Sequence, residues 1–432
     1  MKDSKTIILE ILIILAYYFN NMLGMVFMFG VAAWKLFIQH GKNSIRFLGL
    51  MIMALPMAYI GIAGIGMHQL FSWYNVFLVC FLILILHSYS WKVPIHHIAA
   101  VQLIIILFLL LLNLPYSDDI KQTFVEIAQI FVMLIPIVML HSVKRSLQIE
   151  TAEAQKLISM YVDVCIATSI AMLVQYIFYF FVHIQVGIIE VYGGGRVSCQ
   201  CLFKGASILP VFIGIGMVIL FLDMLSYRIT ITGILKMMVL FLAVILNSSR
   251  TALFALIIVL AFVCLRQLVK RPGLKPLLVI LTGFFVAAGG VYYIISLRRG
   301  LTGFLDANGR VETWINGISI WLADIKNFLI GGGLSDGLWT SMMEPHNFPI
   351  QTLAQSGLII SLIIFNMIFT YLWHNRGNRN KYAIWFVLLS GFLVTDFYAN
   401  AFTTVIFILV DLYGVSNTDM AGKGQIQFLR NS

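Results

Sequence analysis

Three arginines and one histidine, all in polar stretches of an otherwise apolar sequence, are the residues best suited to chemistry. They are Arg196, Arg250, Arg310 and His346. Guanidinium groups stay charged and donate paired hydrogen bonds to phosphate oxygens. A neutral histidine can accept a proton from a hydroxyl group or donate one to a leaving group. Converging on one ligand, these side chains would form a pyrophosphate site with a proton-transfer residue beside it.

Each arginine also has a simpler explanation when taken singly. It could anchor at lipid headgroups or pair with a nearby acid such as Asp306 or Glu312. The four basic residues together favour a substrate site. The acidic residues in the polar stretch at 297–346 could bind one ion. However, no cluster of His, Cys, Asp and Glu residues has the spacing that metal ligands require. A P-loop is also missing. The sequence therefore predicts no metal and no cofactor.

The composition identifies the elements that must position these residues. The chain has 432 residues, of which 61% are hydrophobic and 11% are charged. A soluble domain carries about 25% charged residues. Apolar runs long enough for membrane-spanning helices recur throughout. We predict one all-α, polytopic membrane domain over 1–432, with about 12–14 transmembrane helices in a lipid bilayer.

The predicted spans follow one another with short polar connections. The first begins at Thr6 and lacks a small-residue cleavage site, so it is interpreted as a retained span. Boundaries are about 6–20, 22–38, 45–66, 72–88, 97–114, 122–141, 157–184, 204–224, 229–247, 250–266, 276–296, 347–373, 382–398 and 399–415.

The charge distribution predicts the orientation in the membrane. With the N-terminus in the cytoplasm, most basic residues fall in cytoplasmic loops, as the positive-inside rule requires. This places both termini inside. It also explains the net charge of +10 without a nucleic-acid partner. The outer side keeps few basic residues, namely Lys121, Arg196, Lys204, Arg250, Arg298, Arg299, Arg310 and Lys326.

Two outer loops hold most of the candidate residues. The first covers 185–203 and includes Cys199 and Cys201, which could form a strained disulfide but are favoured as free thiols. The large loop covers 297–346. Within it, Arg310 to Leu329 has apolar residues at helical spacing, which predicts an amphipathic helix on the outer membrane surface. Gly331–Gly333 is expected to end that helix.

The order of these motifs resembles the bacterial O-antigen ligase and Wzy-type polysaccharide polymerase superfamily over about 196–360. The resemblance is carried by Ser249-Arg250-Thr251-Ala252, by Gly309-Arg310 with Trp314, and by Gly331–Gly333 followed by Pro345-His346-Asn347, Gln351 and Gly357. Cys199-Gln-Cys201 departs from the family pattern.

The resemblance implies a glycosyltransferase in the bacterial cytoplasmic (inner) membrane. Its substrate would be an undecaprenyl-diphosphate-linked oligosaccharide at the outer leaflet, and it would need neither a nucleotide nor a metal. His346, Arg310 and Arg250 are the predicted catalytic residues. The predicted substrate-binding residues are Arg196, Lys204, Trp314, Asn347 and Glu344. A flippase and a chain-length regulator are candidate partners.

Three alternatives to a polymerase stay open. An O-antigen ligase would share the chemistry but transfer the glycan to a lipid acceptor. A lipid-linked oligosaccharide flippase or exporter would show two related halves and more charge within its spans. A metal-dependent lipid-linked glycosyltransferase would carry an acidic pair in the first outer loop, where this chain has Asn20-Asn21.

Overall fold

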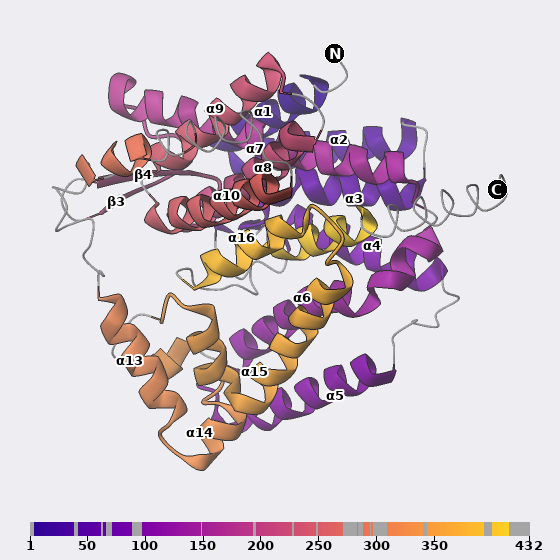
Figure 1. Cartoon of the computed structure of the whole chain (residues 1–432), viewed down its shortest axis with the longest axis vertical. Coiled ribbons are helices and arrows are strands. Elements are labelled where there is room, and N and C mark those ends of the chain that lie inside the picture. The colour runs from indigo at the N-terminus through magenta and orange to yellow at the C-terminus, as the bar shows by residue number, and fades with distance from the viewer. Residues whose placement is uncertain are drawn as a thin grey trace. The chain divides into compact units, whose positions relative to one another are not determined.

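The protein is largely helical in the parts that the structure describes (Figure 1). The computed structural model describes residues 4–38, 42–61, 64–65, 71–88, 97–147, 149–192, 196–226, 229–247, 249–270, 283, 288–293, 295–296, 309–334, 336–339, 344–392 and 400–413. The predicted span 276–296 and Asp306 fall largely or wholly outside these ranges.

The helices follow the predicted apolar segments closely. In the first part of the chain they are α1 (Ser4–Phe19), α2 (Asn21–Ala33), α3 (Asn43–Met53), α4 (Trp73–Ser88), α5 (His97–Leu112), α6 (Ile120–Leu147) and α7 (Thr151–Ile177). Then come α8 (Ile208–Ser226), α9 (Ile231–Leu246), α10 (Arg250–Lys270), α13 (Arg310–Trp321), α14 (Ile325–Ile330), α15 (Phe348–His374) and α16 (Lys381–Gly391). A further helix covers Ala401–Tyr413. Short π-helical or 3-10 turns lie at Trp34–Ile38, Leu55–Met57, Leu114–Tyr116, Phe178–Val182 and Asp336–Trp339.

Six helices in the described part of the chain are long and apolar enough to cross a membrane. This confirms a helical membrane protein as the general class. The six are Asn21–Ile38, Ile98–Tyr116, Thr151–Val182, Ile208–Ser226, Arg250–Val269 and Phe348–His374. Shorter apolar helices, such as α4 and α9, add to them. The total of about 12–14 spans stays a prediction.

The prediction of a continuous span over 45–66 is wrong. Helix α3 ends at Met53, and Pro56 lies in the 3-10 turn that follows. Proline has no N–H to continue the helical ladder. The strands β1 (Ile60–Gly61) and β2 (Gly64–Ile65) then pair antiparallel.

The prediction of an all-α fold also missed a β-hairpin in the first predicted outer loop. Strands β3 (Ile188–Tyr192) and β4 (Arg196–Cys201) pair antiparallel, with Tyr192 opposite Arg196. Cys199 and Cys201 are free thiols, as favoured, but they are buried in β4 rather than exposed in a loop. The pairing shifts register between Ile188 and Ile189, and Cys201 has a positive φ of 57°, so a β-bulge interrupts the strand between the two cysteines.

The chain divides into two compact units. Unit 1 comprises Met1–Val31, Met160–Asn308 and Tyr382–Val394. Unit 2 comprises Ala32–Ser159, Gly309–Lys381 and Thr395–Ser432. Arg196 and Arg250 therefore belong to unit 1, whereas Arg310 and His346 belong to unit 2. The prediction of a single membrane domain over 1–432 stays a prediction.

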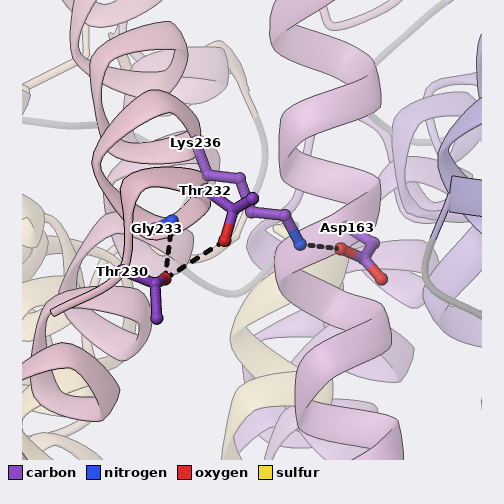
Figure 2. A network of polar contacts seen from close by, with 5 residues as sticks. All are labelled: Asp163, Thr230, Thr232, Gly233 and Lys236. Atoms are coloured by element: carbon purple, nitrogen blue, oxygen red, sulfur yellow. Dashed lines mark hydrogen bonds and ion pairs between the residues drawn. The ribbon is translucent and has the colours of Figure 1, made fainter. Parts of the chain in front are cut away.

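An ion pair joins two apolar helices of unit 1. Figure 2 shows Lys236 reaching from α9 to Asp163 of α7, with the Lys236 Nζ 3.0 Å from the Asp163 Oδ1. Asp163 is 3% exposed. At the start of α9, Thr230 caps the helix, because its Oγ1 accepts a hydrogen bond from the Gly233 N–H at 3.1 Å. These contacts fix the position of α9 against α7.

Close backbone packing in unit 2 depends on two glycines. Helix α15 is kinked at Gly357, where φ is 71°. A Cβ atom there would lie 2.4 Å from the Gly331 nitrogen. A Cβ on Gly331, whose φ is 85°, would lie 2.2 Å from the Gln355 oxygen. The N–H groups of Gly332 and Gly333 donate to carbonyls of α15. The segment after α14 therefore docks directly onto the kink.

The predicted helix from Arg310 to Leu329 is two helices, so the prediction of one continuous helix is wrong. Helix α13 ends at Trp321, and α14 begins after Asp324, whose side chain accepts from the Asn327 N–H at 2.7 Å. Aspartate competes for backbone donors inside a helix and favours the cap. The Trp321 indole N–H closes the turn by donating to the Phe328 oxygen at 3.0 Å. Gly331 ends α14, as the sequence predicted.

The glycine contact predicts a strong effect of one methyl group. Gly357→Ala should lower the free energy of unfolding by about 2–3 kcal/mol, because it adds a backbone clash to an unfavourable positive φ. Gly377→Ala is the matched control, since a Cβ there meets nothing within 4 Å. Thermal unfolding of the purified protein in detergent measures both. Equal midpoints for the two variants would contradict this role of Gly357.

The buried ion pair predicts a non-additive pair of substitutions. Lys236→Met should destabilise the protein by about 3 kcal/mol, because it leaves the Asp163 carboxylate in an apolar site without its ammonium partner. Asp163→Asn combined with Lys236→Met should recover most of that loss. The exposed Lys42–Glu153 pair, at 3.5 Å, supplies the control, and Lys42→Met should change stability little. If the changes in thermal midpoint caused by Asp163→Asn and Lys236→Met simply add in the double variant, this role of the ion pair is contradicted.

Candidate functional site

Arg310 stands at the start of α13 because the preceding backbone turns sharply there. Gly309 is left-handed, with φ of 71°, and occupies the N-cap position. The Thr313 N–H donates to the Gly309 oxygen, and the Thr313 Oγ1 donates to the Arg310 oxygen at 2.9 Å. Arg310 itself is half-buried. Local hydrogen bonds therefore hold the first turn of α13, and the first residue of that turn carries the guanidinium group.

Helix α13 packs on the segment that leads into α15. A Cβ atom on Gly317 would lie 2.7 Å from the Ile350 Cγ2 and 3.3 Å from the Pro345 Cγ. The absence of a side chain at Gly317 thus allows this close approach. Trp314 lies one turn before Gly317 on the same side of α13. The helix that carries Arg310 is thereby packed beside the residues that flank His346.

His346 is close enough to Arg310 for the two to interact electrostatically. Burial and, to a smaller extent, the positive charge of Arg310 together lower the pKa of His346 from its ordinary 6.5 to about 4. The imidazole is consequently neutral at physiological pH. One ring nitrogen then has a free lone pair, as a general base requires. The prediction that Arg310 and His346 belong to one site is consistent with this arrangement.

The entry to α15 is built by two of the predicted substrate-binding residues. Asn347 caps the helix, and its Oδ1 accepts from the Ile350 N–H at 3.1 Å. Glu344 accepts from the Gln351 Nε2 at 3.4 Å. These contacts hold His346 between a cap and a side-chain hydrogen bond. They give Asn347 and Glu344 a structural role next to the histidine, and their role in binding stays a prediction.

Trp314 offers a donor near this segment. Its side chain is half-buried, and its indole Nε1 is buried without a hydrogen-bond partner in the described part of the chain. A buried N–H without a partner is unfavourable by roughly 1–3 kcal/mol. A ligand hydroxyl or phosphate oxygen would satisfy it. The role of Trp314 in substrate binding stays a prediction.

The remaining predicted residues lie in unit 1. Arg196 is the first residue of β4, and its side chain lies outside the described part. Lys204 follows β4 and is exposed. Arg250 is the first residue of α10 and is 9% exposed. The structure thus associates Arg310 with His346, and it describes Arg196, Lys204 and Arg250 separately.

Sequence reasoning missed Asn247, a buried residue at the end of α9. Its amide accepts from the Ser198 hydroxyl and donates to the Cys199 main-chain oxygen, both in β4. The available signal was a polar residue at the end of an apolar span, two positions before the buried Ser249-Arg250 pair. Gly317 was also missed, because a glycine inside a helical segment gives no indication of what it packs against.

No group of three or more His, Cys, Asp or Glu residues able to hold a metal ion occurs among the described residues. Comparison with known proteins gives no matching family model and no significantly similar curated protein. The chemistry of the site therefore has to be argued from its own residues.

The coupling between Arg310 and His346 predicts a measurable change in pKa. In Arg310→Gln the pKa of His346 should rise above about 4 but stay below 6.5, because the charge of Arg310 is lost while burial, the larger effect, remains. Titration by NMR of ¹⁵N-labelled histidine, assigned with His346→Gln, measures it. Lys326→Gln in α14 is the control and should leave the titration unchanged.

The same shift has a defined effect on stability. The unfolded chain binds the His346 proton more tightly than the folded chain does. The free energy of unfolding should therefore fall as the pH drops from about 6.5 to about 4, and this part of the fall should be absent in His346→Gln. A His346 that titrates at 6.5 with or without Arg310 would contradict the proximity of the two groups.

Proposed function

We propose that this chain polymerises undecaprenyl-diphosphate-linked oligosaccharide repeats into a surface polysaccharide, such as a capsule, an exopolysaccharide or O-antigen. The reaction would take place at the outer face of the bacterial cytoplasmic membrane. The observation that carries the proposal is the neutral His346 beside the cationic Arg310, at the entry to the membrane-spanning helix α15. A base and a phosphate-binding cation at a membrane boundary suit a glycan donor that is anchored in lipid by a diphosphate.

The proposed reaction is a displacement at the anomeric carbon of the donor sugar. The acceptor hydroxyl oxygen forms a bond to that carbon, and the bond from the carbon to the diphosphate oxygen breaks. His346 accepts the hydroxyl proton, and undecaprenyl diphosphate leaves with the bonding electrons. Arg310 stabilises the negative charge that develops on the leaving group, most effectively in a site with little water.

The low pKa of His346 fits a base that is activated by its substrate. Without a ligand, burial and the charge of Arg310 hold the pKa of His346 at about 4, which makes the imidazole a weak base. A bound diphosphate would place negative charge beside both groups. This charge offsets Arg310 and raises the pKa of His346 toward neutrality. His346 would then be a stronger base when the donor is present.

Arg250 and Arg196 extend the proposal to unit 1. In the resemblance to the polymerase and ligase superfamily, Arg196, Arg250 and Arg310 correspond to the basic residues of the family. Arg250 is almost buried at the start of α10, where the helix dipole also favours an anion. Its position supports a role in binding phosphate.

A ligase would use the same residues with a different acceptor, and neither acceptor is favoured by a described contact. A flippase is supported by a separate observation. The Asp163–Lys236 pair joins two apolar helices, and Glu10 in α1 is fully buried. Ionisable groups within spans often line transport pathways. Asp163 is 4% exposed at its side chain and paired with Lys236, which favours a structural role for this pair.

The direct test is the surface polysaccharide of the producing strain after deletion of the gene and return of defined variants. His346→Ala and Arg310→Ala should abolish long chains, and single lipid-linked repeats should accumulate on the outer leaflet, because the base or the cation is missing. Loss of one such group lowers the rate by about 10²-fold or more. Lys326→Ala is the matched control for a basic residue in the same loop.

Three outcomes would contradict the polymerase. Full chain length with both His346→Ala and Arg310→Ala, at normal protein levels, would remove these residues from the reaction. Long chains that stay on the lipid carrier in the deletion strain would identify a ligase. Repeats trapped on the cytoplasmic leaflet would identify a flippase.

A further inference from the structure

Asn247 connects the two elements of unit 1 that carry the predicted phosphate-binding arginines. It is 2% exposed and follows the last residue of α9. Its Nδ2 donates to the Cys199 oxygen at 2.9 Å, and its Oδ1 accepts from the Ser198 Oγ at 3.2 Å. Both polar atoms of the amide are therefore bonded to strand β4. No apolar side chain, and no carboxylate, can make both bonds.

The spacing along the chain places Asn247 between the arginines. Arg196 lies two residues before Ser198 in β4, a distance of about 7 Å along a strand. Arg250 lies three residues after Asn247 and opens α10. The bonds of the Asn247 amide thus join the strand that begins with Arg196 to the corner that leads into Arg250.

Each of the joined elements is fixed independently. Helix α9 is tied to α7 by the Lys236–Asp163 ion pair and is capped by Thr230 (Figure 2). The far end of β4 is tied to α7 by Gln175, whose Oε1 accepts from the Cys201 N–H at 2.9 Å. Since both elements are held at their distant ends, the near ends meet at Asn247 with little freedom.

We propose that Asn247 is a positioning residue for binding of the donor diphosphate. It would hold the start of α10, and with it Arg250, in a fixed register with β4. This inference rests on the proposed function, in which Arg250 binds phosphate. Asn247 itself need not touch the substrate. A shift of about 1 Å in a charged group can lower the rate of an enzyme by about 10²-fold.

A double-mutant cycle tests this role. The full-length protein is purified in lipid nanodiscs, and kcat/KM is measured for a defined undecaprenyl-diphosphate-linked repeat. Asn247→Leu, which has a similar volume but no amide, should lower kcat/KM by about 10- to 100-fold, mainly through KM. In an Arg250→Gln background, Asn247→Leu should cause little further loss, because the group that it positions is already absent.

A matched control separates positioning from general stability. Asn378 in unit 2 is also a buried amide that donates to a main-chain carbonyl, that of Val410. Asn378→Leu should lower the thermal midpoint to a similar extent without changing KM for the donor. Ser198→Ala removes only one of the two hydrogen bonds to Asn247. It should reduce kcat/KM by a smaller factor, again without effect in the Arg250→Gln background, and it keeps the test valid if Asn247→Leu does not fold.

The possible failures are distinguishable. Losses that multiply for Asn247→Leu and Arg250→Gln would overturn the positioning role and leave the proposed function standing. An equal increase in KM for Asn378→Leu would also overturn it. Full activity of Arg250→Gln would instead overturn the assignment of Arg250 in the proposed function, and the inference about Asn247 would fail with it.

Discussion

The close contact of Gly331 with the kink of α15 at Gly357 is the interaction on which the architecture of unit 2 depends. Neither position has room for a Cβ atom, and both have positive φ angles. The contact joins α14 to α15, and the side chains of Trp321 and Asn327 join α14 to α13. Gly317 then allows α13 to pack on the entry to α15. The proximity of Arg310 and His346 is therefore a consequence of three glycines and a short turn.

Unit 1 shows a different kind of interaction, in which several buried polar groups are bonded to one another or to the main chain. A polar group without a partner is costly in an apolar environment, so Asn247 and Gln175 bond to the main chain of the β-hairpin, and Lys236 pairs with Asp163. Such bonds are directional, and they define the register of β4 against the helices more closely than apolar packing would. This is the property that a site for a charged ligand requires.

The sequence predicted the helices well and the connections poorly. A long apolar run is stable in lipid only when its backbone groups bond internally, as they do in a helix. Most predicted span boundaries therefore agree with the observed helices within a few residues. Pro56 interrupted one predicted span, and Asp324 divided the predicted amphipathic helix, because each acts through local hydrogen bonding that hydropathy does not register. The β-hairpin was missed because its strands are short and were read as a polar loop. Among the site residues, Arg310 and His346 lie close enough to interact electrostatically, and their shared role in one site stays a prediction. Asn247 could not be identified, because its role depends on a strand that was not predicted.

The central proposal is that this chain transfers glycan from a lipid-linked diphosphate to an acceptor hydroxyl. The most direct test is to reconstitute the purified protein in liposomes with a single synthetic repeat on undecaprenyl diphosphate, with a metal chelator and without nucleotide. The account predicts a ladder of longer lipid-linked chains, with one undecaprenyl diphosphate released for each bond formed. Repeats that keep their original length, or that only move between leaflets, would contradict it.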